Sequence, residues 1–389
     1  MLRTALTSCI LALVLVLQAG SGQAFETRAK AAFVLDHTTG TVLLSKDADV
    51  PLPPASMSKL MTLYVAFEAV REGRLKLDEE LRVSRHAMSY GGSTLFLQAG
   101  ERVSVRDLLR GIIVLSGNDA CAVIAEALSP DGTEAGFARE MTERAKGLGM
   151  THSTFANSNG WPDPRHRMSM RDLAILSQRI IEDFPEFYEM FAEQEFVFDE
   201  TESQNRFNRN PLLGLGIGAD GLKTGHTQEA GYGLTGSVVQ GKRRIIFVIS
   251  GLETEQARAR EAEAITNWAF RQFTTAKLLE AGQVVAEADV WMGEVETVSL
   301  AAEAGLETLV PVGGSDKISA EVVYDGPLEA PVEAGARVGR LLIRPEGLEP
   351  TEVPLVAANA VAKGGAMVRL KLASGRVLRK IIAGAEGAL

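Results

Sequence analysis

The sequence is short of cysteine. Its 389 residues include two, Cys9 and Cys121, and Cys9 lies in an N-terminal segment that we expect to be removed. A single remaining cysteine excludes a disulfide framework within one molecule, although export would have permitted one. Cys121 lies in the apolar stretch 119–128, which favours a buried packing residue over a reactive thiol.

Histidine is also scarce, and the five histidines are His37, His86, His152, His166 and His226. Their positions show none of the spacings that are typical of metal ligands, so we predict no metal site. The C-terminal third contains no histidine and no cluster of titratable residues with a catalytic character. We likewise expect no cofactor.

The apolar run near the N-terminus is short. Residues 10–17 follow a single charge, Arg3, and lead to small and polar residues that end at Ala24. This pattern predicts a secretory signal peptide over residues 1–24, with cleavage after Ala24. The run is too short to span a bilayer, and Cys9 precedes it, which argues against a lipoprotein anchor. We therefore expect an exported protein of the periplasm.

Positive charge is in the minority, with 40 lysines and arginines against 50 aspartates and glutamates and a formal net charge of −10. Residues 362–389 reverse this balance, because they carry six basic side chains and one acidic side chain. An acidic body with a basic tail argues against nucleic acid as a partner and indicates an anionic membrane surface.

The tail also has the pattern of an interfacial helix. On a helical wheel, residues 364–389 place most apolar side chains on one side and the arginines on the other. Such a helix would attach the protein to the outer face of the inner membrane. Lys371 intrudes on the apolar side and Gly375 weakens the helix, so a disordered tail is the alternative.

Two prolines introduce the stretch on which the rest of the chain is organised. Pro53 and Pro54 precede the helix-forming residues 56–73, so a helix is predicted to begin at Ser56. Ser56 and Lys59 then lie one turn apart on one helix face, and we interpret them as the nucleophile and base of an acyl transfer. The unpaired N–H groups and the dipole of a helix start favour an anion there. The alternative is a serine that only caps the helix.

A second motif, Ser116-Gly117-Asn118, lies between two apolar helices that are predicted to begin near residues 104 and 119. A glycine between two helices makes a tight junction from which the flanking side chains can point outward. The pattern recurs at 203–205, but within a polar stretch, so we favour Ser116 and Asn118. Ordinary capping is their alternative role.

The third motif is Lys223-Thr224-Gly225, which we predict to lie on an edge strand. A cation, a hydroxyl group and a glycine that lets a ligand approach the backbone together suit an extended peptide with a terminal carboxylate. On its own, the motif could equally contain a solvated strand lysine.

Around these motifs the sequence predicts one α/β unit whose sheet joins its two ends. Hairpins are expected at 31–44 and 232–250, and helices are expected at 169–182 and 254–273. The glycine-rich segment 91–93 is predicted to be an exposed loop near the site.

In their order, the three motifs resemble the set shared by penicillin-binding proteins and class A β-lactamases. Gly117 in the second motif and His226-Thr227 after the third make the chain similar to D-alanyl-D-alanine carboxypeptidases of the low-molecular-mass penicillin-binding class. The resemblance implies an α/β (α+β) β-lactamase/transpeptidase-like catalytic domain over residues 25–275, with an antiparallel sheet flanked by helices.

Residues 276–361 resemble the C-terminal β domain of that family more loosely. Their apolar runs, separated by glycine, proline and acidic turns, predict a small all-β sandwich. We expect strands at 284–291, 295–300, 318–324 and 340–343.

The resemblance also implies a role for each motif residue. Ser56 would attack the carbonyl group between two terminal D-alanines and form an acyl-enzyme. Lys59 would take its proton, with a pKa lowered by burial and by the Lys223 cation. Ser116 would relay a proton to the leaving D-alanine, and Asn118 would hold Lys59 and the substrate backbone. The backbone N–H groups of Ser56 and His226 would form an oxyanion hole. The implied substrate-binding residues are Lys223, Thr224, Gly225, His226 and Arg209, the last within an Asn-Arg-Asn segment at 208–210.

The implied function is a serine-type D-Ala-D-Ala carboxypeptidase that trims peptidoglycan pentapeptides and is acylated by β-lactam antibiotics. A class A β-lactamase is disfavoured, because no Glu-x-x-Leu-Asn follows Asn118. A D,D-endopeptidase or transpeptidase would use the same motifs and remains an alternative. A wall-binding protein without catalysis is the other, but it would not need all three motifs together.

Overall fold

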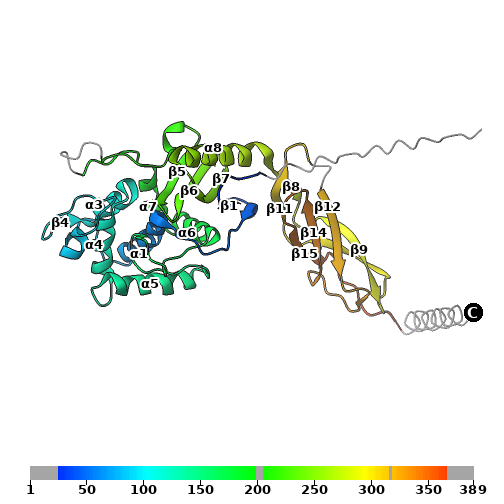
Figure 1. The fold of residues 1–389 in the computed structure, drawn as a ribbon. Helices are drawn as coiled ribbons and strands as arrows, with labels where there is room; N and C mark the ends of the chain where they lie inside the picture. Colours follow the sequence, from blue (N-terminus) through cyan, green and yellow to red (C-terminus); the bar gives the residue numbers. More distant parts are fainter. Residues whose placement is uncertain (1–24, 199–204, 315–317, 366–389) are drawn as a thin grey trace, which may run out of the picture.

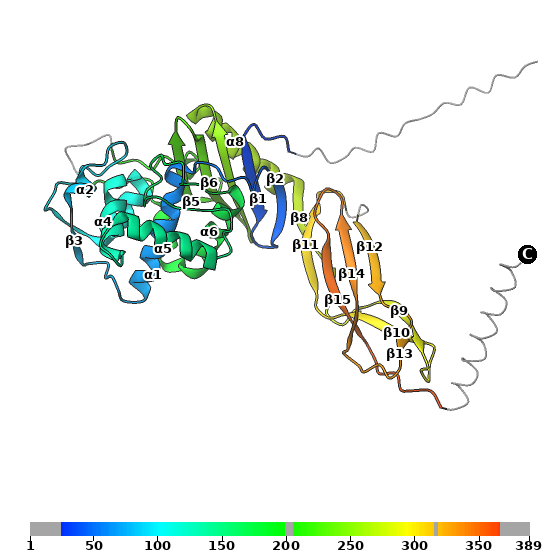
Figure 2. The same cartoon turned by 60° about the horizontal axis from the view of Figure 1, so that its bottom comes forward.

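The computed structural model describes residues 25–198, 205–314 and 318–365. The predicted signal peptide and most of the predicted tail helix lie outside the described residues. The described chain forms an N-terminal α+β body and an elongated C-terminal β body, which projects from the end of the last helix (Figures 1 and 2). In the described part of the chain, no helix has both the length and the hydrophobicity that a bilayer span requires.

The N-terminal body is built on a five-stranded antiparallel sheet with the order β2-β1-β7-β6-β5. Its strands are β1 Ala31–Asp36, β2 Thr41–Lys46, β5 Ala219–Thr227, β6 Gly231–Gln240 and β7 Arg243–Leu252. Both predicted hairpins are confirmed, and the sheet joins segments from the two ends of the body. β5, which carries the third motif, lies at an edge as predicted.

Helices cover both faces of this sheet, and the alternation of side chains along β1 shows why. Phe33 and Leu35 belong to a core shared with the helix α6, Met170–Asp183. Val34 points the other way, into a core shared with the helix α8, Glu255–Gln272. Successive strand residues face opposite sides, so a strand that is apolar throughout is buried on both faces.

A helical cluster lies beside the sheet and surrounds α1, Lys59–Arg71, which is buried along most of its length. The 3₁₀ turn η1, Ala55–Ser58, leads directly into α1, so the helix that we predicted from Ser56 begins as a tighter turn. The other helices of the cluster are α3 Val105–Arg110, the π-helical turn η2 Gly111–Leu115, α4 Asn118–Leu128 and α5 Glu134–Gly147.

Short elements complete the N-terminal body. They are β3 Glu80–Arg82, α2 Arg85–Met88, β4 Arg102–Ser104, α7 Pro185–Tyr188, η3 Glu189–Ala192 and η4 Leu213–Leu215. The side chains of Ser104, Ser169 and Thr254 cap the starts of α3, α6 and α8 by accepting a backbone N–H three residues ahead. These caps explain why the starts of these three helices could be predicted closely.

The C-terminal body is all-β, as predicted, with a six-stranded sheet in the order β12-β14-β15-β10-β9-β13 and a pair β11-β8. Its strands are β8 Phe273–Leu279, β9 Val284–Trp291, β10 Thr297–Ala302, β11 Leu306–Pro311, β12 Ile318–Tyr324, β13 Leu328–Glu329, β14 Arg337–Pro345 and β15 Thr351–Ala357. The runs at 284–291 and 318–324 match β9 and β12, whereas β8, β11, β13 and β15 were not predicted. One apolar core joins both sheets.

Candidate active site

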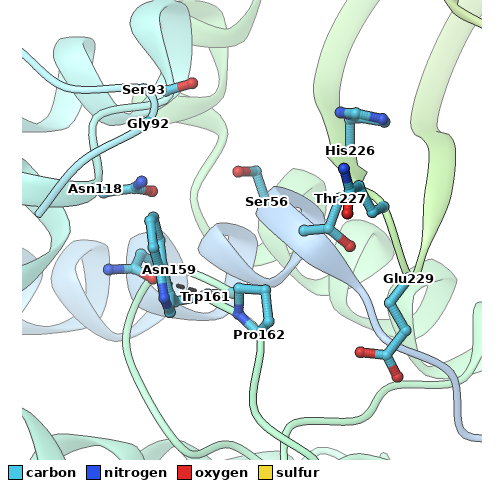
Figure 3. Close-up of a pocket in the computed structure, with 12 residues that line it drawn as sticks. Ser56, Gly92, Ser93, Asn118, Asn159, Trp161, Pro162, His226, Thr227 and Glu229 are labelled. Carbon is cyan, nitrogen blue, oxygen red and sulfur yellow. Dashed lines mark hydrogen bonds between the residues drawn. The ribbon is translucent and has the colours of Figure 1, made fainter.

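The first motif places two polar side chains in contact at the start of α1. Lys59 Nζ lies 2.7 Å from Ser56 Oγ, and the lysine side chain is fully buried. Ser56 lies on η1, where the backbone turns sharply after Pro54, and its hydroxyl group points into the central cleft (Figure 3). The contact that we predicted from a spacing of three residues is therefore present.

Two further contacts fix the Lys59 amine. Nζ lies 2.8 Å from Asn118 Oδ1 and 2.7 Å from the backbone oxygen of Asn159. The Asn118 amide is oriented by its own Nδ2, which donates to the Gly91 oxygen at 2.8 Å. Both amide oxygens can only accept, so a neutral amine donates one N–H to each and directs its lone pair at the Ser56 hydroxyl.

Burial and, to a smaller extent, the positive charge of Arg209 lower the pKa of Lys59 to about 8. Burial is the main reason that the pKa of Lys223 lies well below its usual value, and repulsion from Lys59 adds to it. This repulsion is mutual, so it agrees with the expected influence of the Lys223 cation on Lys59. A lysine with a pKa near 8 has a substantial neutral fraction near neutral pH, which a general base requires.

The second motif sits at the junction of η2 and α4. Ser116 adopts a left-handed conformation, with φ 64°, and lines the cleft together with Ser56. Gly117 is needed because a Cβ atom there would lie 2.3 Å from Leu95 Cδ1. The carboxylate of Asp119 accepts hydrogen bonds from the N–H groups of Leu95 and Leu97. It therefore holds the loop that carries Leu95 against the junction of η2 and α4. Packing against Leu95 thus accounts for glycine at the centre of the motif.

The third motif lies on β5 beside η1. A Cβ atom on Gly225 would come within 2.9 Å of the Pro54 oxygen and 3.2 Å of the Met57 nitrogen. We expected this glycine to make room for a ligand; instead it makes room for the turn that carries Ser56. The consequence is a close approach of the edge strand to the nucleophile.

Lys223 is buried and has no carboxylate partner among the described residues. Its one hydrogen bond, to the Thr224 oxygen, is long at 3.4 Å. A buried cation without a counter-ion is costly, so the site is suited to an anionic group that arrives with a ligand.

Arginines complete this cationic side of the cleft, around a cavity of about 200 Å³ that Ser56, Ser116 and Thr224 also line. Arg209 donates to Ser93 Oγ at 2.5 Å, so the structure brings this predicted residue to the site. Arg258 of α8 was not predicted. It is 3 % exposed and donates to the Arg209 oxygen at 3.2 Å. In the sequence it pairs with Glu255 three residues earlier and is indistinguishable from a surface helix residue.

A larger cleft of about 750 Å³ opens on the other side of Ser56. As predicted, the glycine-rich loop lies at the site, where Gly92 and Ser93 line the cleft (Figure 3). Asn159 and Trp161, which the sequence analysis did not single out, also line it. Asn157 Oδ1 accepts the N–H groups of Gly160 and Trp161 and so shapes the turn that carries them.

Cys121 is buried, as expected, and burial raises the pKa of its thiol to about 12. Within the ranges that the structure describes, no group of three or more histidine, cysteine, aspartate or glutamate side chains is placed to hold a metal ion.

Comparison with known proteins covers most of the chain. The family model described as D-alanyl-D-alanine carboxypeptidase, Peptidase S11, matches residues 18–254, and the model of the penicillin-binding protein 5 C-terminal domain matches residues 273–363. The D-alanyl-D-alanine carboxypeptidase DacD of Escherichia coli K12 is 36% identical over 358 residues, which are 90% of this chain and 91% of that protein.

Solved structures agree with the sequence matches. The D-alanyl-D-alanine carboxypeptidase DacD from Francisella tularensis is similar with a TM-score of 0.77 and 29% identity, over 87% of this chain and 95% of that one. Penicillin-binding protein D2 from Listeria monocytogenes in its ampicillin-bound form is similar with a TM-score of 0.56 and 33% identity, over 62% and 97% of the two chains.

Proposed function

This chain belongs to the D-alanyl-D-alanine carboxypeptidase family, Peptidase S11, and on that premise we propose how its own residues carry out the reaction. The protein is a serine-type carboxypeptidase with a penicillin-binding fold. The substrate is a peptidoglycan stem peptide that ends in D-Ala-D-Ala, and β-lactams acylate the same serine.

One observation supports the proposed roles most strongly: Lys59 Nζ is hydrogen-bonded to Ser56 and to two oxygens that can only accept. Neutral Lys59 takes the Ser56 proton while Oγ attacks the carbonyl carbon of the penultimate D-alanine. The backbone N–H groups of Ser56 and His226 stabilise the oxyanion that forms.

Collapse of this intermediate breaks the C–N bond and leaves an acyl group on Ser56. The leaving amine of D-alanine takes a proton, which passes from Lys59 through the Ser116 hydroxyl group. Water then attacks the ester and gives up a proton to Lys59, which restores Ser56 and releases the shortened peptide. Transfer to an amine in place of water would make the protein a transpeptidase or an endopeptidase, which is the second candidate.

The terminal carboxylate of the substrate is bound on the cationic side of the cleft. Lys223 and Thr224 of β5 hold it, and Arg209 and Arg258, which line the same cavity as Thr224, add positive charge. The peptide backbone lies along the free edge of β5 as an added strand. Gly225 keeps this edge close to Ser56.

The remaining parts of the proposal concern export and domains. Residues 1–24 direct export to the periplasm, residues 25–275 are the catalytic domain, and residues 276–361 form a separate β domain. Residues 364–389 bind the inner-membrane surface. Deletion of 364–389 should move the protein from the membrane fraction to the soluble fraction; unchanged fractionation would refute the anchor.

The reaction is tested with the mature chain and Ser56→Ala. We expect a penicillin adduct in the intact mass and release of D-alanine from a D-Ala-D-Ala pentapeptide, both lost in the variant. An adduct without release would favour the transpeptidase or endopeptidase. Neither signal in a folded protein would leave the chain without the proposed catalysis.

A further inference from the structure

The turn that carries Ser56 has a strained backbone. Ala55, the residue before the nucleophile, has a positive φ of 49°, which is uncommon for a residue with a Cβ atom. The start of η1 at Pro54 has no side-chain cap. A backbone in such a conformation persists only where the surrounding structure holds it. The position of Ser56 therefore depends on contacts between η1 and other segments of the chain.

Two segments enclose η1, the strand β5 on one side and the loop 155–168 on the other (Figure 3). On the side of β5, a Cβ atom on Gly225 would come within 3.2 Å of the Met57 nitrogen. On the side of the loop, a Cβ atom on Gly160 would lie 1.9 Å from the Ala55 oxygen. These contacts are close, but they are contacts of backbone atoms that lack a directional side-chain bond.

A buried hydrogen bond between two side chains adds this direction. Ser58 is the last residue of η1 and lies between Ser56 and Lys59 in the sequence. Its Oγ lies 2.8 Å from Nε2 of His166, which belongs to the loop. Both side chains are buried, with exposed fractions of 0% for Ser58 and 2% for His166. The loop is thus bonded to the turn at a residue between the nucleophile and its base.

The second ring nitrogen of His166 shows which group donates. Nδ1 accepts from the Ala156 N–H at 3.3 Å. Burial lowers the pKa of His166 to about 4, so the ring is neutral near neutral pH. A neutral imidazole carries one proton, which must then be on Nε2, and Nε2 donates to Ser58 Oγ. The ring of Phe155 packs edge-on against the imidazole, with 5.4 Å between the ring centroids. His166 is therefore a donor with a fixed orientation.

We propose that His166 is a positioning residue for the acylation step, because its hydrogen bond to Ser58 holds η1 in the conformation that keeps Ser56 Oγ beside Lys59 Nζ. The inference rests on the proposed function, in which Lys59 takes the Ser56 proton. The loop then fixes both partners of this proton transfer: the backbone oxygen of Asn159 holds the amine, and His166 holds the turn that carries the hydroxyl group. A misplacement of about 1 Å between reacting groups can cost about a hundredfold in rate.

The test compares His166→Asn with His166→Gln. The amide nitrogen of glutamine can take the place of Nε2 and still donate to Ser58, whereas the shorter asparagine cannot reach it. We expect the rate constant of acylation by penicillin to fall about ten- to a hundredfold in His166→Asn and less than about threefold in His166→Gln. The dissociation constant of the noncovalent penicillin complex should not change, because the cationic side of the cleft is intact. The dependence of the acylation rate on penicillin concentration separates the two constants.

Ser58→Ala removes the acceptor of the same bond and should slow acylation as His166→Asn does. The double variant Ser58→Ala/His166→Asn should be no slower than the slower single variant, because both substitutions remove one contact. Ser177→Ala is the matched control. Ser177 of α6 is fully buried and donates to the Leu173 oxygen at 2.7 Å, so this variant also loses the hydrogen bond of a buried serine. It should be less stable to urea but acylated at the rate of the unmodified protein.

The outcomes separate the inference from the function on which it rests. Unchanged acylation of His166→Asn refutes the inference, and so does a glutamine variant that is as slow as the asparagine variant. Equal slowing in Ser177→Ala would show that the bond only stabilises the fold, which also refutes the inference. Absence of a penicillin adduct in the unmodified protein refutes the proposed function itself.

Discussion

Lys59 Nζ lies as close to the backbone oxygen of Asn159 as to the hydroxyl group of Ser56, at 2.7 Å in both cases. The Lys59 amine, the base of the proposed mechanism, is thus held by the turn 157–161 as well as by its own helix. This turn lies about a hundred residues further along the chain. The reactivity of Ser56 therefore depends on how firmly distant segments fix the Lys59 amine.

Acylation should rise with pH through the titration of Lys59. Its pKa is lowered to about 8, and the neutral amine, which predominates above that pH, is the active form. The second-order rate of acylation by penicillin should increase about tenfold between pH 7 and pH 9 and then level off. Stopped-flow or quench mass spectrometry measures it. Arg209→Gln removes a positive charge that lowers this pKa, so the acylation rate of this variant should rise at a higher pH. An acylation rate of the unmodified protein that does not change with pH would contradict Lys59 as the base.

A substrate without a terminal carboxylate should be poor. Lys223 is buried without a counter-ion, so a peptide ending in D-Ala-D-Ala-amide leaves it unpaired. We expect kcat/KM to fall about ten- to a hundredfold, the usual range for one lost charge-assisted hydrogen bond. Lys223→Gln should reduce activity on the acid and narrow the difference between acid and amide. Equal rates for the two peptides in the unmodified enzyme would argue against this carboxylate site.

Glu134 should stabilise the turn that holds Lys59. Its Oε1 accepts from the N–H and hydroxyl of Ser158 at 2.9 and 2.5 Å, and its Oε2 contacts His86 and Tyr90, each at 2.7 Å. Glu134→Gln cannot accept all four hydrogen bonds, so we expect a loss of roughly 1–3 kcal/mol in the free energy of unfolding, measured by urea denaturation. Penicillin acylation should slow as well, because Asn159 follows Ser158 directly.

The same carboxylate gives a pH signature. Burial raises the pKa of Glu134, but the hydrogen bonds from Ser158, His86 and Tyr90 outweigh it, and the pKa lies below its usual value. A lowered folded-state pKa means that the stabilisation is complete above the unfolded-state pKa and is lost as the pH falls through the folded-state pKa. The stability difference between the unmodified protein and Glu134→Gln should therefore shrink in acid. A difference independent of pH would show that the charge is not involved.

The sequence predicted the site better than it predicted the surroundings. Ser56 and Lys59 are three residues apart where the turn η1 runs directly into α1, so local geometry alone brings them together. The caps of Ser104, Ser169 and Thr254 likewise act within one turn. Asn159 and Arg258 were missed because their roles arise only from tertiary contacts. Asn159 acts through its backbone oxygen, and Arg258 has the sequence pattern of an exposed helix residue.

In the C-terminal β body, the accuracy of the strand predictions depended on whether turn residues mark the ends of each strand. β9 and β12 were predicted with their correct bounds because glycine and acidic turns mark both of their ends. β8 follows α8 without a turn residue between them, so the run 273–279 could not be separated from the helix by pattern. The two-residue strand β13 is too short to show any periodicity.

Gly117 should tolerate no side chain. A Cβ atom there would lie 2.3 Å from Leu95 Cδ1 and 3.2 Å from the Cβ atom of Ala120, so Gly117→Ala must shift the Leu95 side chain, which is itself buried. We expect a loss of roughly 1–3 kcal/mol in the free energy of unfolding, the usual cost of overpacking, together with slower acylation of Ser56. Gly147→Ala is the matched control. Gly147 lies on α5 with open space around its position, so alanine there should stabilise the protein by about 0.5–1 kcal/mol. Equal effects of the two substitutions would mean that the contact with Leu95 does not constrain the junction between Ser116 and Asn118.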